Sequence, residues 1–284
     1  MTGTIRMRRC AVAVFTCILI GAIAATPSLG EDQMTDAEKE VVEELMRMGA
    51  AVQFNDDRRA IEVLLPTKKK LDVVLEKLGA LDALQKLDLT STKVTDGSLS
   101  RLADIPKLEV LSLSFTSISD RGLPHIKRFA RLRLLTLTST KVSDRGMLNI
   151  HNLKELRALR LDKTRVTDNG VKHIKKVTSL TSLDLSATHV TSDGMKHVAI
   201  LKNLEGLYLA KTSVTDEGIA HLVGLENLED LDLTDTPITD AAIPHLIKIK
   251  TLLGLEIPGT KISKEGVKKL KAALPELQVL HDEG

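Results

Sequence analysis

Apolar residues recur along this chain with a period of 24 residues, starting at Leu84. Eight successive segments follow the pattern LxxLxLxxTxVTDxGLxHLxxLxx, and the last of them opens at Leu252. The column of Leu87 is leucine in all eight segments, and the columns of Leu89, Val94 and Leu99 stay apolar throughout. A fixed period of this length is typical of repeat proteins in which each segment is one structural unit.

Each unit contains two kinds of spacing. The segment LxxLxL alternates with a period of two and predicts a short strand, whereas GLxHLxxL spaces its apolar residues by three and predicts a short helix. Stacked units would pair their strands in one parallel sheet and bury both flanks of every unit. Because strands lie about 4.8 Å apart and helices about 8 to 10 Å apart, the stack should curve with the sheet on its concave face and the helices on its convex face.

These repeats, over residues 84–276, resemble the leucine-rich repeat family. They look most like the exported bacterial type with 24-residue units and a TxVTDxGL signature, and they are similar to the cysteine-containing repeats of F-box adaptor proteins. The resemblance implies an α/β fold, a right-handed horseshoe-shaped solenoid, and a role in protein interaction. No F-box-sized helical domain precedes the repeats, so a ubiquitin-ligase adaptor is the weaker alternative.

Those families place Asn or Cys in a column where this chain always has threonine. The threonines are Thr92, Thr116, Thr140, Thr164, Thr188, Thr212, Thr236 and Thr260. They fall where the chain leaves the strand and turns inward, and a hydroxyl there can both donate to and accept from backbone groups. We interpret the column as a structural ladder, because no histidine or carboxylate base recurs beside it at the spacing that a nucleophile requires.

Two further polar columns invite a metal-binding interpretation. Thr167 with Asp168 and Thr215 with Asp216 each precede a glycine and are predicted helix N-caps, since one carboxylate per unit falls short of a calcium site. Five histidines share one helical column: His125, His173, His197, His221 and His245. Zn–N bonds of about 2.0 to 2.1 Å cannot span helices about 8 to 10 Å apart, so we predict structural histidines and no metal.

The outward positions of the strands are where the units differ, and we expect the binding site there. The candidates are Phe115, Arg160, Lys163, Asp184, Tyr208, Lys211, Asp230, Asp232 and Asp235. Arg160 and Asp184 lie one strand apart and should form an ion pair, which in the simplest interpretation is solvated and has no function. In the functional interpretation, Tyr208 is an aromatic anchor inside a charged rim.

The first thirty residues have the features of a secretory signal peptide. Arg6, Arg8 and Arg9 precede an apolar run of 16 residues, Cys10–Ala25, and small residues end at Gly30. As a helix the run would reach only about 24 Å, short of the roughly 30 Å hydrocarbon layer, so cleavage is expected rather than anchoring. Both cysteines, Cys10 and Cys17, lie in this segment, so no disulfide is expected in the mature chain.

The remaining chain is predicted to form four segments. Residues 31–59 would be an N-terminal helical cap and residues 60–83 a degenerate first repeat that lacks the threonine. The eight repeats follow over residues 84–276, and residues 277–284 would form a C-terminal strand and tail. Both ends would thereby shield the apolar interior of the stack.

Charge and motifs limit the functions that remain. Without the three arginines of residues 1–30, 37 basic residues face 38 acidic ones, a net charge of −1, which gives no footprint for nucleic acid or a membrane surface. The chain has no GxSxG, HExxH, GxGxxG or phosphate-binding loop, so we expect neither catalysis nor a cofactor.

The predicted function is a non-catalytic protein–protein interaction module of the cell envelope. We expect a monomer, exported to the periplasm or the extracellular space, or anchored if the signal is not cleaved. A carbohydrate or cell-wall binder is the alternative, although sugars usually stack on aromatic rings and the chain has one tyrosine and four phenylalanines.

Overall fold

The computed structural model describes residues 34–65 and 71–282, so the predicted signal peptide lies outside the described residues. One 11-stranded sheet runs through them, with its strands in the order of the chain. Strand β1 is antiparallel to β2, and every later pair is parallel.

The elements alternate between strand and helix. The strands are β1 (Ala51–Phe54), β2 (Ala60–Leu64), β3 (Lys86–Asp88), β4 (Val110–Ser112), β5 (Leu134–Thr136), β6 (Ala158–Arg160), β7 (Ser182–Asp184), β8 (Gly206–Tyr208), β9 (Asp230–Asp232), β10 (Gly254–Glu256) and β11 (Gln278–Leu280). The α-helices are α2 (Asp36–Arg47), α3 (Asp72–Lys77), α4 (Asp96–Arg101), α5 (Asp144–Met147), α6 (Asp168–Ile174), α7 (Ser192–Val198), α8 (Asp216–Leu222), α9 (Ile243–Leu246) and α10 (Lys264–Ala273). Tighter 3-10 turns are η1 (Leu78–Ala80), η2 (Leu123–Arg128), η3 (Ile150–Asn152) and η4 (Asp240–Ala242).

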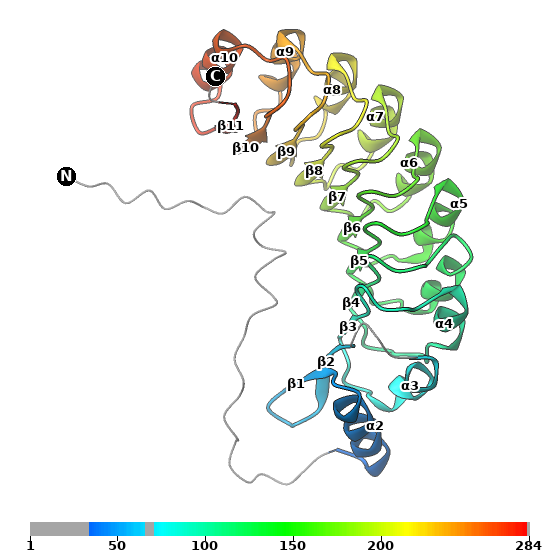
Figure 1. Ribbon diagram of the computed structural model, residues 1–284. Coiled ribbons are helices and arrows are strands. Elements are labelled where there is room, and N and C mark those ends of the chain that lie inside the picture. Colours follow the sequence, from blue (N-terminus) through cyan, green and yellow to red (C-terminus); the bar gives the residue numbers. More distant parts are fainter. Residues whose placement is uncertain (1–33, 66–70, 283–284) are drawn as a thin grey trace, which may run out of the picture. The chain divides into compact units, whose positions relative to one another are not determined.

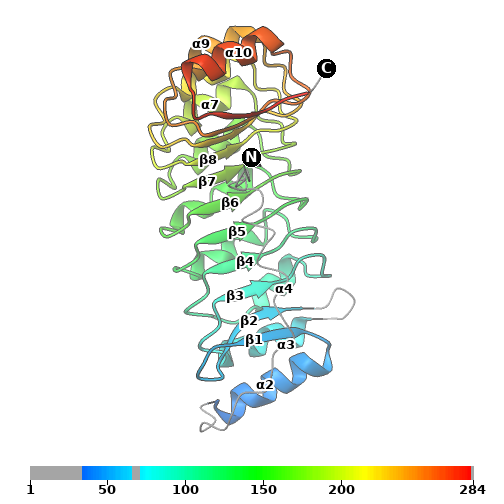
Figure 2. The same ribbon diagram turned by 90° about the vertical axis from the view of Figure 1, so that its left-hand side faces the viewer.

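The strands line the concave side of this stack and the helices its convex side (Figure 1). Figure 2 looks onto the strand side, where β1 to β8 follow one another in order and no described helix covers them. The structure therefore confirms the predicted fold, a leucine-rich repeat solenoid with a parallel sheet.

The register of the sheet follows the sequence period. Leu159 pairs with Leu135 on one side and with Leu183 on the other, in each case at a separation of one unit. A column in the aligned repeats is therefore a row of neighbouring side chains in space, about 4.8 Å apart.

The inward columns form one continuous core. Leu87, Leu135 and Leu207 are completely buried, and the core extends from Val41 in α2 to Leu277 before β11. Each buried leucine contributes roughly 1.5 to 3 kcal/mol, so the stability of a unit depends on the neighbours that cover it.

The N-terminal segment differs in part from the expected helical cap. It contains helix α2 and also strand β1, which forms a hairpin with β2 through a turn in which Arg58 has φ of 59°. Glu38 of α2 is buried, and both of its carboxylate oxygens accept hydrogen bonds from Arg59 Nε, at 3.0 and 2.8 Å. This ion pair ties the helix to the hairpin and compensates the burial of the charge.

Candidate functional site: the concave face of the sheet

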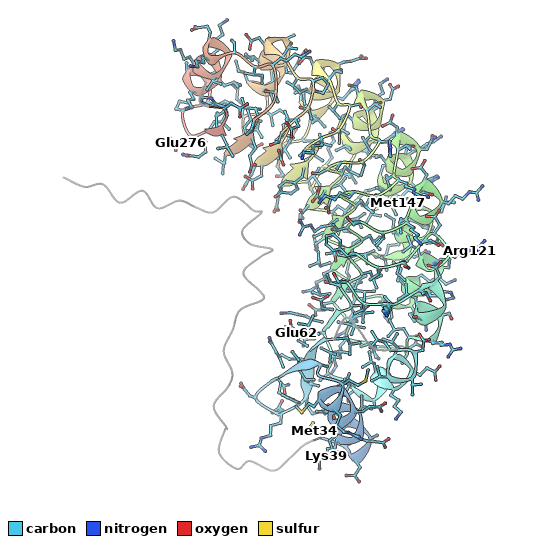
Figure 3. All side chains as sticks on the ribbon, in the orientation of Figure 1. Met34, Lys39, Glu62, Arg121, Met147 and Glu276 are labelled. Carbon is cyan, nitrogen blue, oxygen red and sulfur yellow. The ribbon has the colours of Figure 1, made fainter. Side chains whose placement is uncertain are left out.

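The concave face is formed by the residues of each strand that point away from the core. In β6 the middle residue, Leu159, is buried, while Ala158 and Arg160 on either side of it are half-buried. Glu62 of β2 occupies the same column as Ala158 and projects to the strand side in Figure 3, whereas Arg121 projects to the helix side. Alternation along a strand thus separates a constant apolar face from a variable outer face.

A turn follows each strand and adds a further outward residue, with positive φ in all eight repeats. We call these residues the turn column: Ser91, Phe115, Ser139, Lys163, Ala187, Lys211, Asp235 and Gly259, with φ from 53° to 69°. Seven of the eight are not glycine, although glycine is the residue that adopts this conformation freely. The sequence alone does not signal this conformation, because only the last unit carries glycine in this column.

All nine candidate residues lie on strands or in the turn column of the concave face. Arg160, Asp184, Tyr208 and Asp232 end their strands, and Asp230 begins β9. Phe115, Lys163, Lys211 and Asp235 belong to the turn column, and all four are exposed. The register sets Arg160, Asp184, Tyr208 and Asp232 opposite one another in four consecutive strands, whereas Phe115 lies two units before Lys163 in the turn column.

Two ion pairs cross between neighbouring units. Arg160 Nε lies 3.6 Å from Asp184 Oδ2, and Lys211 Nζ lies 3.8 Å from Asp235 Oδ2. Asp184 is 8% exposed, and this burial raises its pKa; nearby Asp162 adds to the rise, while the backbone hydrogen bond from Ser186 and the charge of Arg160 oppose it. The first ion pair is therefore partly desolvated on the side of Asp184.

Tyr208, the candidate aromatic anchor, does not protrude from the concave face. Its side chain is 9% exposed because the ring lies back over Gly206, two residues earlier on the same face. A Cβ atom on Gly206 would lie 3.1 Å from the Tyr208 hydroxyl oxygen and 3.3 Å from Cε2 of the ring. The glycine therefore provides the space that the ring occupies, and Phe115, 54% exposed, is the open aromatic of these columns.

Acidic residues dominate the concave face around β9. Asp230 and Asp232 flank Leu231 on this strand, and Asp235 follows in the turn column. Burial raises the pKa of Asp230, and the charge of neighbouring Glu229 adds to the rise. Asp232 instead accepts a hydrogen bond of 2.8 Å from the backbone N–H of Thr234.

The threonine column makes the same hydrogen bond in every unit. Each hydroxyl donates to the carbonyl of the residue three positions earlier, at 2.5 to 2.7 Å, as Thr164 does to Leu161. Seven of these threonines are buried, and Thr260 in the last unit is half-buried. These bonds satisfy carbonyl groups at the point where the chain enters the interior.

The aspartates after the N-cap residues join neighbouring units. Thr167 is the N-cap of α6, whereas Asp144 of the preceding unit accepts hydrogen bonds from the Thr167 N–H at 2.7 Å and from its hydroxyl at 2.8 Å. Asp96, Asp120, Asp168, Asp216 and Asp240 each bond in the same way to the unit that follows them. The recurrence of the [ST]D pair was the sequence signal, but it does not reveal that the carboxylate reaches the next unit.

The histidine column lies on the convex side, in the helices and in η2. All five of its members are half-buried, and the described residues contain no cluster of three or more His, Cys, Asp or Glu side chains that could hold a metal ion. Within the same described ranges, every helix is too short or too polar to cross a lipid bilayer.

Comparisons with known proteins place this architecture in a family. A family model described as a leucine-rich repeat region matches residues 109–282, which is more than half of the chain. The chain belongs to the leucine-rich repeat family. A search of curated proteins found no match to this leucine-rich repeat protein.

Solved structures of similar fold include two from Listeria monocytogenes. Internalin C2 (inlC2) is 21% identical, with a TM-score of 0.58 over 87% of this chain and 93% of that chain. A second internalin (inlF) is 17% identical, with a TM-score of 0.52 over 91% of this chain and 92% of that chain. At these identities the likeness shows a shared solenoid fold.

Proposed function

We propose that this leucine-rich repeat protein binds a partner protein on its concave face and does not catalyse a reaction. The observation that carries the proposal is the contrast between the two faces of the sheet. The middle residue of each strand from β3 to β10 is leucine, whereas its outward neighbours change from Val110 and Ser112 in β4 to Asp230 and Asp232 in β9. Folding requires the constant face, so the variable face is free to be adapted to a ligand.

A protein ligand is supported by the form of this surface. The concave face is a broad sheet without a described element over it, and it mixes ion pairs with uncharged residues, as protein interfaces do. Sugar binding would favour several exposed aromatic rings, whereas Tyr208 is largely covered and leaves Phe115 as the open ring of these columns.

We place this function in the cell envelope, after export and cleavage behind Gly30, with the mature protein a monomer. The basic, apolar and small-residue succession of residues 1–30 supports export. The mature chain would then comprise a cap over residues 31–59, a degenerate repeat over 60–83, eight repeats over 84–276, and the strand and tail over 277–284. Mass spectrometry of the exported protein tests the cleavage, and sedimentation tests the oligomeric state.

Site-specific photo-crosslinking in living cells tests the binding face. A photoreactive residue in place of Lys211 or Asp235, both exposed in the turn column, should give a protein adduct that protease removes. The matched controls are Lys196 and Glu217, exposed on α7 and α8 of the convex side, which should give none. Adducts from the convex positions alone, or adducts sensitive only to glycosidases, would contradict the proposal.

A further inference from the structure

Phe115 is an exposed aromatic residue in a backbone conformation that bulky side chains avoid. Its φ is 57° and 54% of its surface is exposed, so the core does not hold the ring in place. Two of its counterparts in the turn column are the small polar residues Ser91 and Ser139. The positive φ belongs to this turn in every repeat, so what distinguishes Phe115 is a large apolar ring that is left exposed, and this points to a function outside the fold.

Four outward columns around Phe115 carry no charged side chain over two adjacent units, and the charges beside them, Glu109 and Arg133, pair with each other at 3.5 Å. We call it the uncharged patch: Val110, Ser112, Ser114 and Phe115 of one unit with Leu134, Thr136, Thr138 and Ser139 of the next. The strands β4 and β5 pair directly, with Val110 opposite Leu134 and Ser112 opposite Thr136. In the same four columns, each of the other six repeats has at least one charged side chain.

Hydroxyl groups of the patch are bonded within the protein. Ser114 Oγ donates to Thr136 Oγ1 at 3.0 Å, and Thr138 Oγ1 donates to Asp162 Oδ1 at 2.6 Å. Ser114 and Thr136 are themselves buried. Hydroxyl groups that are already bonded within the protein form few hydrogen bonds with water. A ligand that covers this patch therefore breaks few protein–water hydrogen bonds.

Basic residues border the patch on the side of β6. Arg157 and Lys163 are both exposed, and neither forms an ion pair with a described residue. The carboxylates nearby are already engaged, since Asp162 accepts from Thr138 and Asp184 pairs with Arg160. Lys163 lies two units from Phe115 in the turn column, a distance of about 10 Å at about 4.8 Å per strand.

We propose that the uncharged patch docks a segment of a partner protein that sets an apolar side chain against Phe115 and directs carboxylates to Arg157 and Lys163. The inference rests on the proposed function, which it narrows to three of the eight repeats and to an acidic partner segment. An exposed aromatic residue beside a charged rim is the arrangement that concentrates binding energy at protein interfaces. The acidic surface around β9 would instead select a basic segment, and that is the competing outcome.

Selection from a random displayed peptide library against the purified protein tests the inference. The enriched peptides should combine Asp or Glu with aromatic or aliphatic residues. Phe115→Ser should weaken their binding by about tenfold or more. This variant introduces the residue that Ser91 and Ser139 already provide in the same conformation, so the fold should persist and circular dichroism should not change.

Reversing the charges of Arg157 and Lys163 tests whether they select the charge of the bound peptide. The double variant R157E/K163E should select basic in place of acidic peptides, while Glu217→Arg, a control on α8 of the convex side, should leave the binding of the original peptides unchanged. The inference would be overturned by peptides that are basic from the start, that bind the Phe115→Ser variant normally, or that no longer bind the Glu217→Arg variant, and so would a library that yields no binder. Crosslinking through Lys211 and Asp235 is independent of these outcomes, so it shows whether the proposed function stands without this patch.

Discussion

At the scale of single residues, a residue of the turn column can lower the stability of the fold while it serves binding. Phe115 should cost stability where it stands, because a left-handed conformation is unfavourable for a residue with a Cβ atom by about 1 to 2 kcal/mol. Phe115→Gly should therefore raise the free energy of unfolding by about 0.5 to 1 kcal/mol in urea denaturation, part of the gain being lost to the freer unfolded chain. Ala187→Gly, with φ of 53° at the starting residue, is the control and should raise it similarly. A fall in stability for both variants would show that the turns are not strained.

The threonine hydroxyls should contribute to stability in proportion to their burial. Thr164→Val keeps the shape of a buried side chain but removes the donor to the Leu161 carbonyl, 2.6 Å away. We expect the free energy of unfolding to fall by about 1 to 2 kcal/mol. Thr260→Val, at the half-buried end of the column, should cost less because water can replace the hydroxyl. Equal losses at both positions would contradict this account of the ladder.

His197 should make the protein less stable in mild acid. Burial lowers its pKa below the ordinary 6.5, and the charges of Lys175 and Lys172 lower it further. The unfolded chain then takes up a proton first, so this stability is present above about pH 6.5 and is lost as the pH falls below that value. Thermal unfolding of His197→Gln should show a smaller loss between neutral and acidic pH than the parent protein. An identical pH profile for the two proteins would rule out this contribution.

At the scale of elements, the segment that starts the convex side in units two to eight is bonded to the unit before it. Asp144→Ala removes two acceptors for Thr167, and we expect a loss of about 1 to 3 kcal/mol in the free energy of unfolding. Unit five provides the natural comparison, because Ser192 stands in place of the aspartate and accepts from the Thr215 N–H at 3.0 Å. Ser192→Ala should therefore cost less than Asp144→Ala. If chemical denaturation shows a larger loss for Ser192→Ala than for Asp144→Ala, the carboxylate does not bind the next unit more strongly than a hydroxyl does.

Regular elements could be predicted from the sequence, whereas contacts between them largely could not. The leucine columns fix which side of each strand is buried, because alternation has only two faces. The Tyr208 ring is buried because it lies over Gly206, which has no side chain. A glycine two residues earlier on the same face of the strand is a signal that the sequence does contain. The bonds of Asp144 to the next unit and the positive φ of Phe115 depend on the stacked geometry, which a single unit does not contain.

At the scale of the whole molecule, units should be removable only in whole numbers. Deleting residues 157–180 removes one period of 24 residues, so the strand β5 would pair with β7 in the same register in which it now pairs with β6. We expect a folded protein with a single cooperative transition and a lower denaturant m-value, since less surface is buried. Deleting residues 157–168 instead removes half a period and would set a helix segment of one unit beside the strand of the next. That variant should lose its cooperative transition in circular dichroism and denaturant unfolding, because the buried leucines no longer align. If both deletions unfold, the stack depends on particular contacts of the fourth unit, and nearest-neighbour stacking is not sufficient to explain its stability.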